Sequence, residues 1–161
     1  MPLTRTIKNF GAILRSAYFF GVDGVAVCER NRAPLSPAAS RASGGAMELM
    51  TVHSVDSLAN FLTDSGSRGW KVAGTSAPGS LRATPSHAFD YSAAPTILVL
   101  GNEGAGLRPH IARLCSAFLT IETAANNKDS LIDSLNVSAA TAVLCSQWRT
   151  SSSSSSKAKN N

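Results

Sequence analysis

The amino-acid sequence predicts an α/β fold with a mainly parallel sheet and helices on both faces. Strand-like and helix-like stretches alternate along most of the chain, as in proteins built from βαβ units. The stretch at residues 96–100 is apolar, as expected for a central strand that is covered on both faces. Glycine- or serine-rich turns follow three predicted strands, and parallel sheets bind ligands at this end of their strands.

Local signals predict the elements in the first third of the chain. Asn9 and Gly21 are a predicted N-cap and end of the first helix. Ser36 and Pro37 predict the start of a short helix, which residues 43–46 interrupt. The predicted elements are helices over residues 10–20 and 37–41 and strands over residues 25–28 and 49–52.

Hydrophobic spacing predicts the remaining elements. A helix is predicted between Ser54 and Gly66. Its apolar residues recur every three or four positions: Val55, Leu58, Ala59 and Leu62. Residues 76–95, rich in Ser, Pro, Gly and Ala, are a predicted loop. Strands are predicted at 71–75, 96–100 and 118–121, with a helix at 109–114. Ser134 is a predicted cap for a final helix with one apolar face: Val137, Thr141, Leu144 and Trp148.

Composition indicates one globular domain with an anionic partner. Of 161 residues, 43% are hydrophobic and 16% charged, which predicts one compact globular domain over residues 1–150. The serine-rich segment 151–161 is predicted to be disordered. A net charge of +5 favours nucleic acid first and a membrane surface second. No apolar run reaches the roughly 20 residues of a membrane span.

The three cysteines indicate reduced thiols. Cys28, Cys115 and Cys145 are far apart and form no CxxC pair, so we expect buried thiols and neither a disulfide framework nor a metal site.

The glycine-rich turn after the strand at 96–100 is the first candidate site. Its sequence is Gly-Asn-Glu-Gly-Ala-Gly, over residues 101–106. It lacks the Lys of a phosphate-binding Walker loop, and its spacing differs from GxGxxG. Spacing alone is equally consistent with a tight structural turn. Glu103 favours a neutral or cationic ligand, because a carboxylate would repel a phosphate.

Two further segments carry polar residues of interest. Arg15 follows Asn9 by six residues and lies in an otherwise apolar helix, where a guanidinium usually has a partner. Residues 134–138, with the sequence Ser-Leu-Asn-Val-Ser, are explained equally well by a serine cap.

Together, these segments resemble the TrmH branch of the SPOUT RNA methyltransferases. Residues 9–17 resemble the first motif of that family, residues 98–107 the second and residues 134–140 the third, in the family's order. Residues 43–48 match a further signature between the first two. Within the family, residues 18–23 and the insert before Asp133 look most like the members that act on large-subunit rRNA in fungal mitochondria.

The resemblance implies a fold with a C-terminal trefoil knot, a homodimer, S-adenosylmethionine as cofactor, and no metal and no membrane partner. The location that it implies is mitochondrial, and otherwise cytoplasmic. The implied activity is methylation of a ribose 2′-hydroxyl in RNA, with a guanosine of large-subunit rRNA as the target. The residues implied in catalysis are Arg15, Asn9, Glu103, Ser134 and Asn136. Those implied in cofactor binding are Thr75, Leu100, Gly101, Gly104, Ile121, Leu135 and Asn136.

The expected role of Arg15 is to orient the ribose or a neighbouring phosphate, because a guanidinium with a pKa above about 12 is a poor base. Two alternatives stay open: a tRNA methyltransferase of the same branch, and an inactive RNA-binding or ribosome-assembly protein. The family's usual strand before the first motif is missing or poor, and its N-terminal RNA-binding domain is absent, which leaves open a fragment or an incomplete gene model. Glu122 stands where the family often has Pro.

Overall fold

The structure is a computed structural model, which describes residues 3–28, 35–78, 80, 82–102, 106–123 and 134–157. The chain divides into two compact units, Met1–Leu58 and Ala59–Asn161. A single domain over residues 1–150 stays a prediction.

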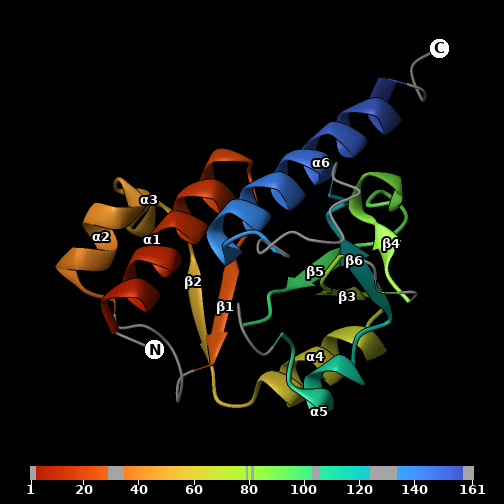
Figure 1. Ribbon diagram of the computed structural model, residues 1–161, viewed down its shortest axis with the longest axis horizontal. Helices are drawn as coiled ribbons and strands as arrows, with labels where there is room; N and C mark the ends of the chain where they lie inside the picture. The colour runs from red at the N-terminus through yellow and green to blue at the C-terminus, as the bar shows by residue number, and fades with distance from the viewer. Residues whose placement is uncertain are drawn as a thin grey trace. The chain divides into compact units, whose positions relative to one another are not determined.

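The first unit pairs two parallel strands with three helices (Figure 1). Its elements are α1 (Leu3–Phe19), β1 (Val25–Cys28), α2 (Pro37–Ser43), α3 (Ala46–Leu49) and β2 (Val52–Val55). The strands pair in parallel from Val25↔Val52 to Cys28↔Val55. Helix α1 ends as predicted, because Gly21 adopts a φ of 74° and donates to the Tyr18 carbonyl.

Three predictions for this unit are wrong, the first being Val55, which lies in β2 and not in the helix predicted after Ser54. Asn9 is not an N-cap, because α1 already begins at Leu3 and Asn9 lies within it. The strand predicted at 49–52 begins at Val52 instead. Gly44 and Gly45 both adopt positive φ, so the chain ends α2 and at once starts the short helix α3. The cap at Ser36 is confirmed, since its hydroxyl accepts from the Ala39 N–H at 3.3 Å.

The second unit has a four-stranded parallel sheet in the order β4-β6-β3-β5. Its strands are β3 (Lys71–Thr75), β4 (Thr84–Pro85), β5 (Thr96–Val99) and β6 (Ala117–Thr120). The helices are α4 (Leu58–Ser67), which starts at the unit boundary, η2 (Ser86–Ala88), α5 (Pro109–Ala112) and α6 (Val137–Lys157). Figure 1 shows α4 and α5 on one side of the sheet and α6 on the other, which confirms the predicted α/β fold.

The core of the second unit lies between this sheet and α6. Its buried members are Ala73, Tyr91, Leu119 and Leu144, against which Phe89, Leu98, Ile121 and Trp148 pack. The predicted apolar face of the last helix is thereby confirmed. Strand β5, predicted to be central, is an edge strand of the sheet among the described residues; β3 and β6 are its inner strands.

Helix α6 continues into the serine run and ends at Lys157. The hydroxyls of Thr150 and Ser151 donate to carbonyls four residues earlier, at 3.0 and 2.9 Å. Such bonds satisfy the short side chains within a helix that an upstream apolar face has already anchored. No helix among the described residues is long and apolar enough to cross a membrane.

Candidate functional site

The ends of β3 and β5 are joined by the side chain of Thr75. Its hydroxyl donates to the Val99 carbonyl at 3.3 Å and accepts from the Gly101 N–H at 3.1 Å. Thr75 thus fixes the chain where it leaves β5 through Leu100, which is partly buried. Three predicted cofactor-binding residues therefore lie together at the carboxyl end of the sheet, where parallel sheets bind ligands.

The glycine-rich turn closes on itself. The Asn102 N–H donates to the Gly106 carbonyl at 2.9 Å, and the Gly106 N–H donates back to the Asn102 carbonyl at 2.8 Å. A Cβ on Gly101 would lie 2.8 Å from the carbonyl carbon of Gly106, while Gly106 needs its φ of +63°. These glycines are therefore required by the turn's own backbone. Glu103 and Gly104 lie outside the described residues.

A third glycine, Gly74 in strand β3, lets the segment that follows this turn pack closely against the sheet. A Cβ on Gly74 would lie 2.6 Å from Leu107 Cδ1 and 2.9 Å from Cys115 Sγ. Gly74 lies in an inner strand, where glycine often marks a close approach. A glycine inside an otherwise apolar strand is the sequence signal for this role.

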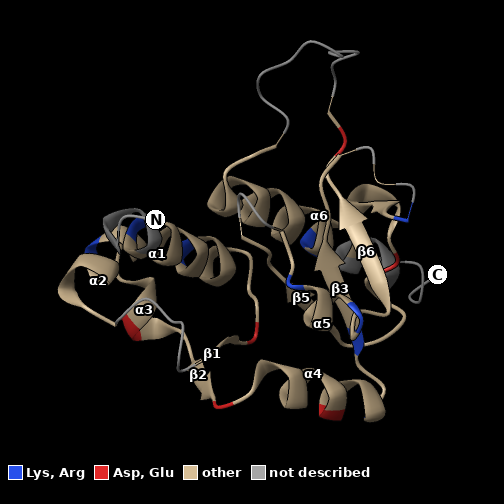
Figure 2. Ribbon diagram, turned by 60° about the horizontal axis from the view of Figure 1, so that its bottom comes forward, with Lys and Arg blue, Asp and Glu red and all other residues tan. Residues whose placement is uncertain are grey.

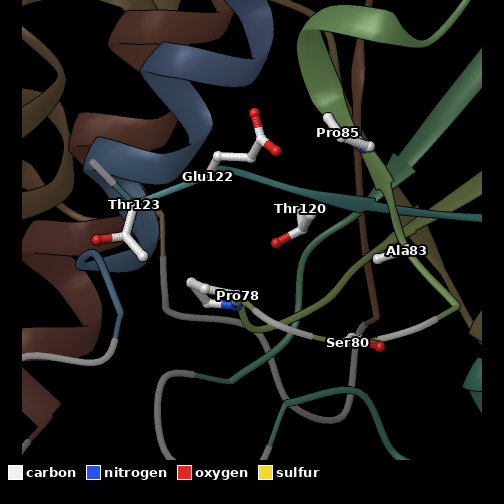
Figure 3. A pocket seen from close by; sticks show the side chains of 7 residues that line it. All are labelled: Pro78, Ser80, Ala83, Pro85, Thr120, Glu122 and Thr123. Atoms are coloured by element: carbon white, nitrogen blue, oxygen red, sulfur yellow. The ribbon is translucent and has the colours of Figure 1, made fainter. Parts of the chain in front are cut away.

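A pocket of about 380 Å³ lies beside the end of β6 (Figure 3). Thr120 is 7% exposed, and its hydroxyl has no hydrogen-bond partner. Its side chain points into the space that the labelled residues surround in Figure 3. The residues that line the pocket are Pro78, Ser80, Ala83, Pro85, Thr120, Glu122 and Thr123. An unsatisfied buried hydroxyl at a pocket wall is suited to bind a polar group of a ligand.

Sequence reasoning missed this pocket. Residues 76–95 were predicted only as a loop, yet β4 pairs there with β6, with Pro85 opposite Thr120. Ile121, predicted from the resemblance, follows Thr120 directly and packs on the core. At the rim, His87 Nδ1 lies 3.6 Å from Glu122 Oε2, but both side chains are largely exposed, so this pair contributes little.

The start of α6 is capped by Asn136 and not, as predicted, by Ser134. The Asn136 side-chain oxygen accepts from the Ser138 N–H at 3.0 Å and from the Ser138 hydroxyl at 2.6 Å. Its carbonyl accepts from the Ala140 N–H. The helix begins one residue later, at Val137. Leu135, just before the cap, is 50% exposed and available for contact with a ligand.

Asn9 and Arg15 lie on α1 in the first unit, whereas the site residues described above belong to the second unit. Arg15 is exposed, and no described carboxylate pairs with it, so the expected protein partner is not found there. Its guanidinium lies beside Gly44, where an added Cβ would be 3.6 Å from Arg15 Cζ. The cation is thus presented next to residues 43–48, the segment that separates the first two motifs.

The cysteines are free thiols, but only Cys145 is fully buried. Burial raises the pKa of the Cys145 thiol to about 11, and burial followed by the neighbouring Cys145 raises the pKa of Tyr91 to about 12. Both groups belong to the core and stay protonated near neutral pH. Among the described residues, no group of three or more His, Cys, Asp or Glu side chains could hold a metal ion.

Comparison with known proteins identifies the class. The chain belongs to the SpoU rRNA Methylase family, which matches residues 3–146. This confirms the resemblance that the three motifs indicated. Among solved structures, a TrmH-family RNA methyltransferase of Porphyromonas gingivalis is 32% identical, with a TM-score of 0.76 over 89% of this chain and 55% of that one.

Particular relatives share the same name. The human protein "rRNA methyltransferase 1, mitochondrial" is 43% identical over 151 residues, which cover 87% of this chain and 42% of the human one. A SpoU methyltransferase of Streptomyces viridochromogenes, solved in complex with AdoMet, is 26% identical, with a TM-score of 0.78 over 92% of this chain and 57% of that one. The chain spans less than half the length of the curated mitochondrial relatives.

Proposed function

We propose that this chain is the catalytic part of an RNA ribose 2′-O-methyltransferase that uses S-adenosylmethionine. The observation that carries the proposal is the pair of hydrogen bonds by which Asn102 and Gly106 join the two described ends of the glycine-rich turn, beside Gly101, whose N–H donates to the Thr75 hydroxyl at the end of β3. This turn lies at the ligand-binding end of a parallel sheet in a chain of the SpoU family. The names of the mitochondrial relatives support rRNA as substrate and mitochondria as location. The large subunit is proposed from the motif resemblance alone.

The residues present fit the cofactor. S-adenosylmethionine combines an adenosine with a methionine part that carries two cationic groups, a sulfonium and an amine, and one carboxylate. The unpartnered Thr120 hydroxyl would bind a polar atom, and the Glu122 carboxylate in the same pocket would favour a cation. Backbone groups of Leu100, Gly101 and Ile121 would hold the adenosine, with Gly104, Leu135 and Asn136 completing the site. When bound, the cofactor supplies a methyl group on a good leaving group.

The protein's own task is then alignment of the ribose and removal of its proton. Arg15 would orient the ribose or a neighbouring phosphate, since it is exposed and has no described carboxylate partner. Asn9, Glu103 and Ser134 would support the substrate. Asn136 holds the start of α6 and thereby positions Leu135. The same proposal includes a guanosine target, the trefoil knot and a homodimer in which Arg15 acts near the subunit interface.

The proposal is tested with the full chain. We expect calorimetry to show S-adenosylmethionine binding, and tritiated methyl transfer to label a ribose of large-subunit rRNA and not tRNA. Arg15→Lys keeps the charge but loses the planar fork, so turnover should fall about 100-fold while cofactor affinity stays unchanged. Normal turnover by Arg15→Lys would remove Arg15 from the mechanism. Cofactor-independent RNA binding without turnover would favour an assembly protein.

The homodimer is tested separately by light scattering. We expect the mass of two chains at micromolar concentration. A folded monomer that still methylates RNA would contradict this part of the proposal.

A further inference from the structure

The packing of α1 on α2 places three cations on one surface of the first unit. The two helices cross very closely at Gly11, where an added Cβ would lie 2.5 Å from Ala42 Cβ and 2.7 Å from the Ala39 carbonyl oxygen. Lys8 and Arg15 flank Gly11 on α1. They are seven residues apart, so they lie on one face of the helix and about 10 Å apart along it.

Arg41 of α2 joins this surface. Lys8 and Arg41 line one pocket of about 380 Å³, together with Ile7, Ala38 and Ala42. At the other side of the crossing, the guanidinium of Arg15 lies against Gly44, the residue that ends α2. We call Lys8, Arg15 and Arg41 the basic seam.

Nothing in the described part of the unit neutralises the basic seam. All three side chains are exposed, and none forms an ion pair with a described carboxylate. Neither α1 nor α2 contains an acidic residue. In Figure 2, α1 and α2 carry blue segments (Lys and Arg) and no red ones (Asp and Glu), while α3 carries a red segment. Three uncompensated cations beside a concave surface attract an anion with several charges.

We infer that Lys8 and Arg41 bind phosphates of the RNA backbone. These phosphates neighbour the nucleotide that Arg15 contacts. This rests on the proposed function, because it takes RNA as the substrate. The seam matches a polyanion that runs along the helix crossing, since its charges are spread over about two turns of α1. The other residues that line the pocket are apolar, Ile7, Ala38 and Ala42, so the charged contacts to a ligand there would come from Lys8 and Arg41. Lys8 and Arg41 are positioning residues, which act on affinity and register.

The experiment measures binding of a fluorescent single-stranded rRNA fragment to the full chain by anisotropy over a series of salt concentrations. Lys8→Gln and Arg41→Gln should each weaken binding several-fold. Each should also reduce the slope of log affinity against log salt by about 0.7, the value for one phosphate contact on a single strand. Lys8→Arg and Arg41→Lys should keep the slope. Cofactor affinity, measured by calorimetry, should not change in any of these variants.

The matched control removes two exposed cations of the second unit, with Arg68→Gln and Arg149→Gln together. This control should leave the RNA affinity, and the slope of log affinity against log salt, within twofold of the values for the parent chain. Parental affinity and slope in the Lys8→Gln, Arg41→Gln double variant would overturn the inference. So would equally tight, seam-dependent binding of polyglutamate, which would indicate an acidic protein partner.

The outcomes separate the inference from the proposed function. Methyl transfer that persists with unaltered RNA affinity in the double variant would refute the basic seam alone. Seam-dependent RNA binding by a chain that neither binds cofactor nor transfers a methyl group would refute the methyltransferase and keep the seam.

Discussion

The two units use glycine for opposite purposes. In the second unit, Gly74, Gly101 and Gly106 let backbone and side chains close on one another, so the turn is held by its own hydrogen bonds. In the first unit, Gly11 lets two helices approach while their cations stay exposed and unpaired. The first arrangement is preorganised without a ligand, whereas the second leaves charges that a ligand must satisfy. Substitutions at these glycines should therefore have different consequences.

The largest expected effect is at Gly101. In Gly101→Val, the side chain must displace the backbone at Gly106, 2.8 Å from the Cβ position. Opening the turn should cost about 3 kcal/mol and so lower cofactor affinity about 100-fold, as measured by calorimetry. Gly24→Ala is the control, because its Cβ would lie at ordinary contact distances, 3.4 Å from the His53 side chain and 3.5 Å from the Thr51 carbonyl oxygen. Unchanged affinity in Gly101→Val would mean that the cofactor binds elsewhere.

The next largest effect is expected at Gly11. Gly11→Ala places a methyl group 2.7 Å from the Ala39 carbonyl oxygen, so the helices must separate. We expect the first unit to lose about 2 kcal/mol of unfolding free energy, measured by urea denaturation with far-UV circular dichroism. Gly66→Ala is a matched control in α4, since nothing lies within 4 Å of its Cβ position. That variant should be stabilised by about 0.5–1 kcal/mol.

A smaller effect should distinguish the second unit's core at alkaline pH. The pKa values of Cys145 and Tyr91 are raised from 9.0 and 10.0 to about 11 and about 12. The folded state therefore holds these protons more tightly than the unfolded state. Their contribution to stability is complete below about pH 9 and is lost as the pH rises towards 11 and 12.

The measurable loss should be on the order of 1–2 kcal/mol between about pH 8 and 10.5, from the shift in urea midpoint. Tyr91→Phe combined with Cys145→Ala should flatten this dependence. A parent chain whose midpoint is constant over that range would show that the two groups are not shielded from solvent.

The helix ends that depend on residues a few positions apart could be predicted from the sequence. Gly21 ends α1 and Ser36 caps α2, because both signals act within a few residues. Asn9 failed as a cap, because the same polar residue type also occurs inside a helix that starts earlier. Asn136, and not Ser134, caps α6, since either could do so and only the backbone path selects one.

The rest of the candidate site depends on contacts between distant segments. The pairing of Pro85 with Thr120 creates the pocket wall, and no local signal in a Ser- and Pro-rich segment predicts that register. Likewise, the basic seam requires α2 to cross α1 at Gly11, which brings Lys8 and Arg41 to one pocket across 33 residues of sequence. The glycine turn and Arg15 were indicated by the sequence motifs. The motifs indicated neither the pocket wall at Thr120 nor the basic seam.

The smallest expected effect concerns the Thr120 hydroxyl, which is buried and has no partner. Thr120→Val removes a desolvated polar group without loss of bulk, so the ligand-free protein should gain up to about 1 kcal/mol of unfolding free energy. If that hydroxyl binds the cofactor, the same variant should bind S-adenosylmethionine several-fold more weakly. Thr141→Val is the matched control, because the equally buried Thr141 hydroxyl donates to the Val137 carbonyl at 2.7 Å. Its loss should cost stability and leave cofactor affinity unchanged. A Thr120→Val protein that is more stable and keeps full affinity would place the cofactor away from this pocket, while the turn at residues 101–106 would still define the site.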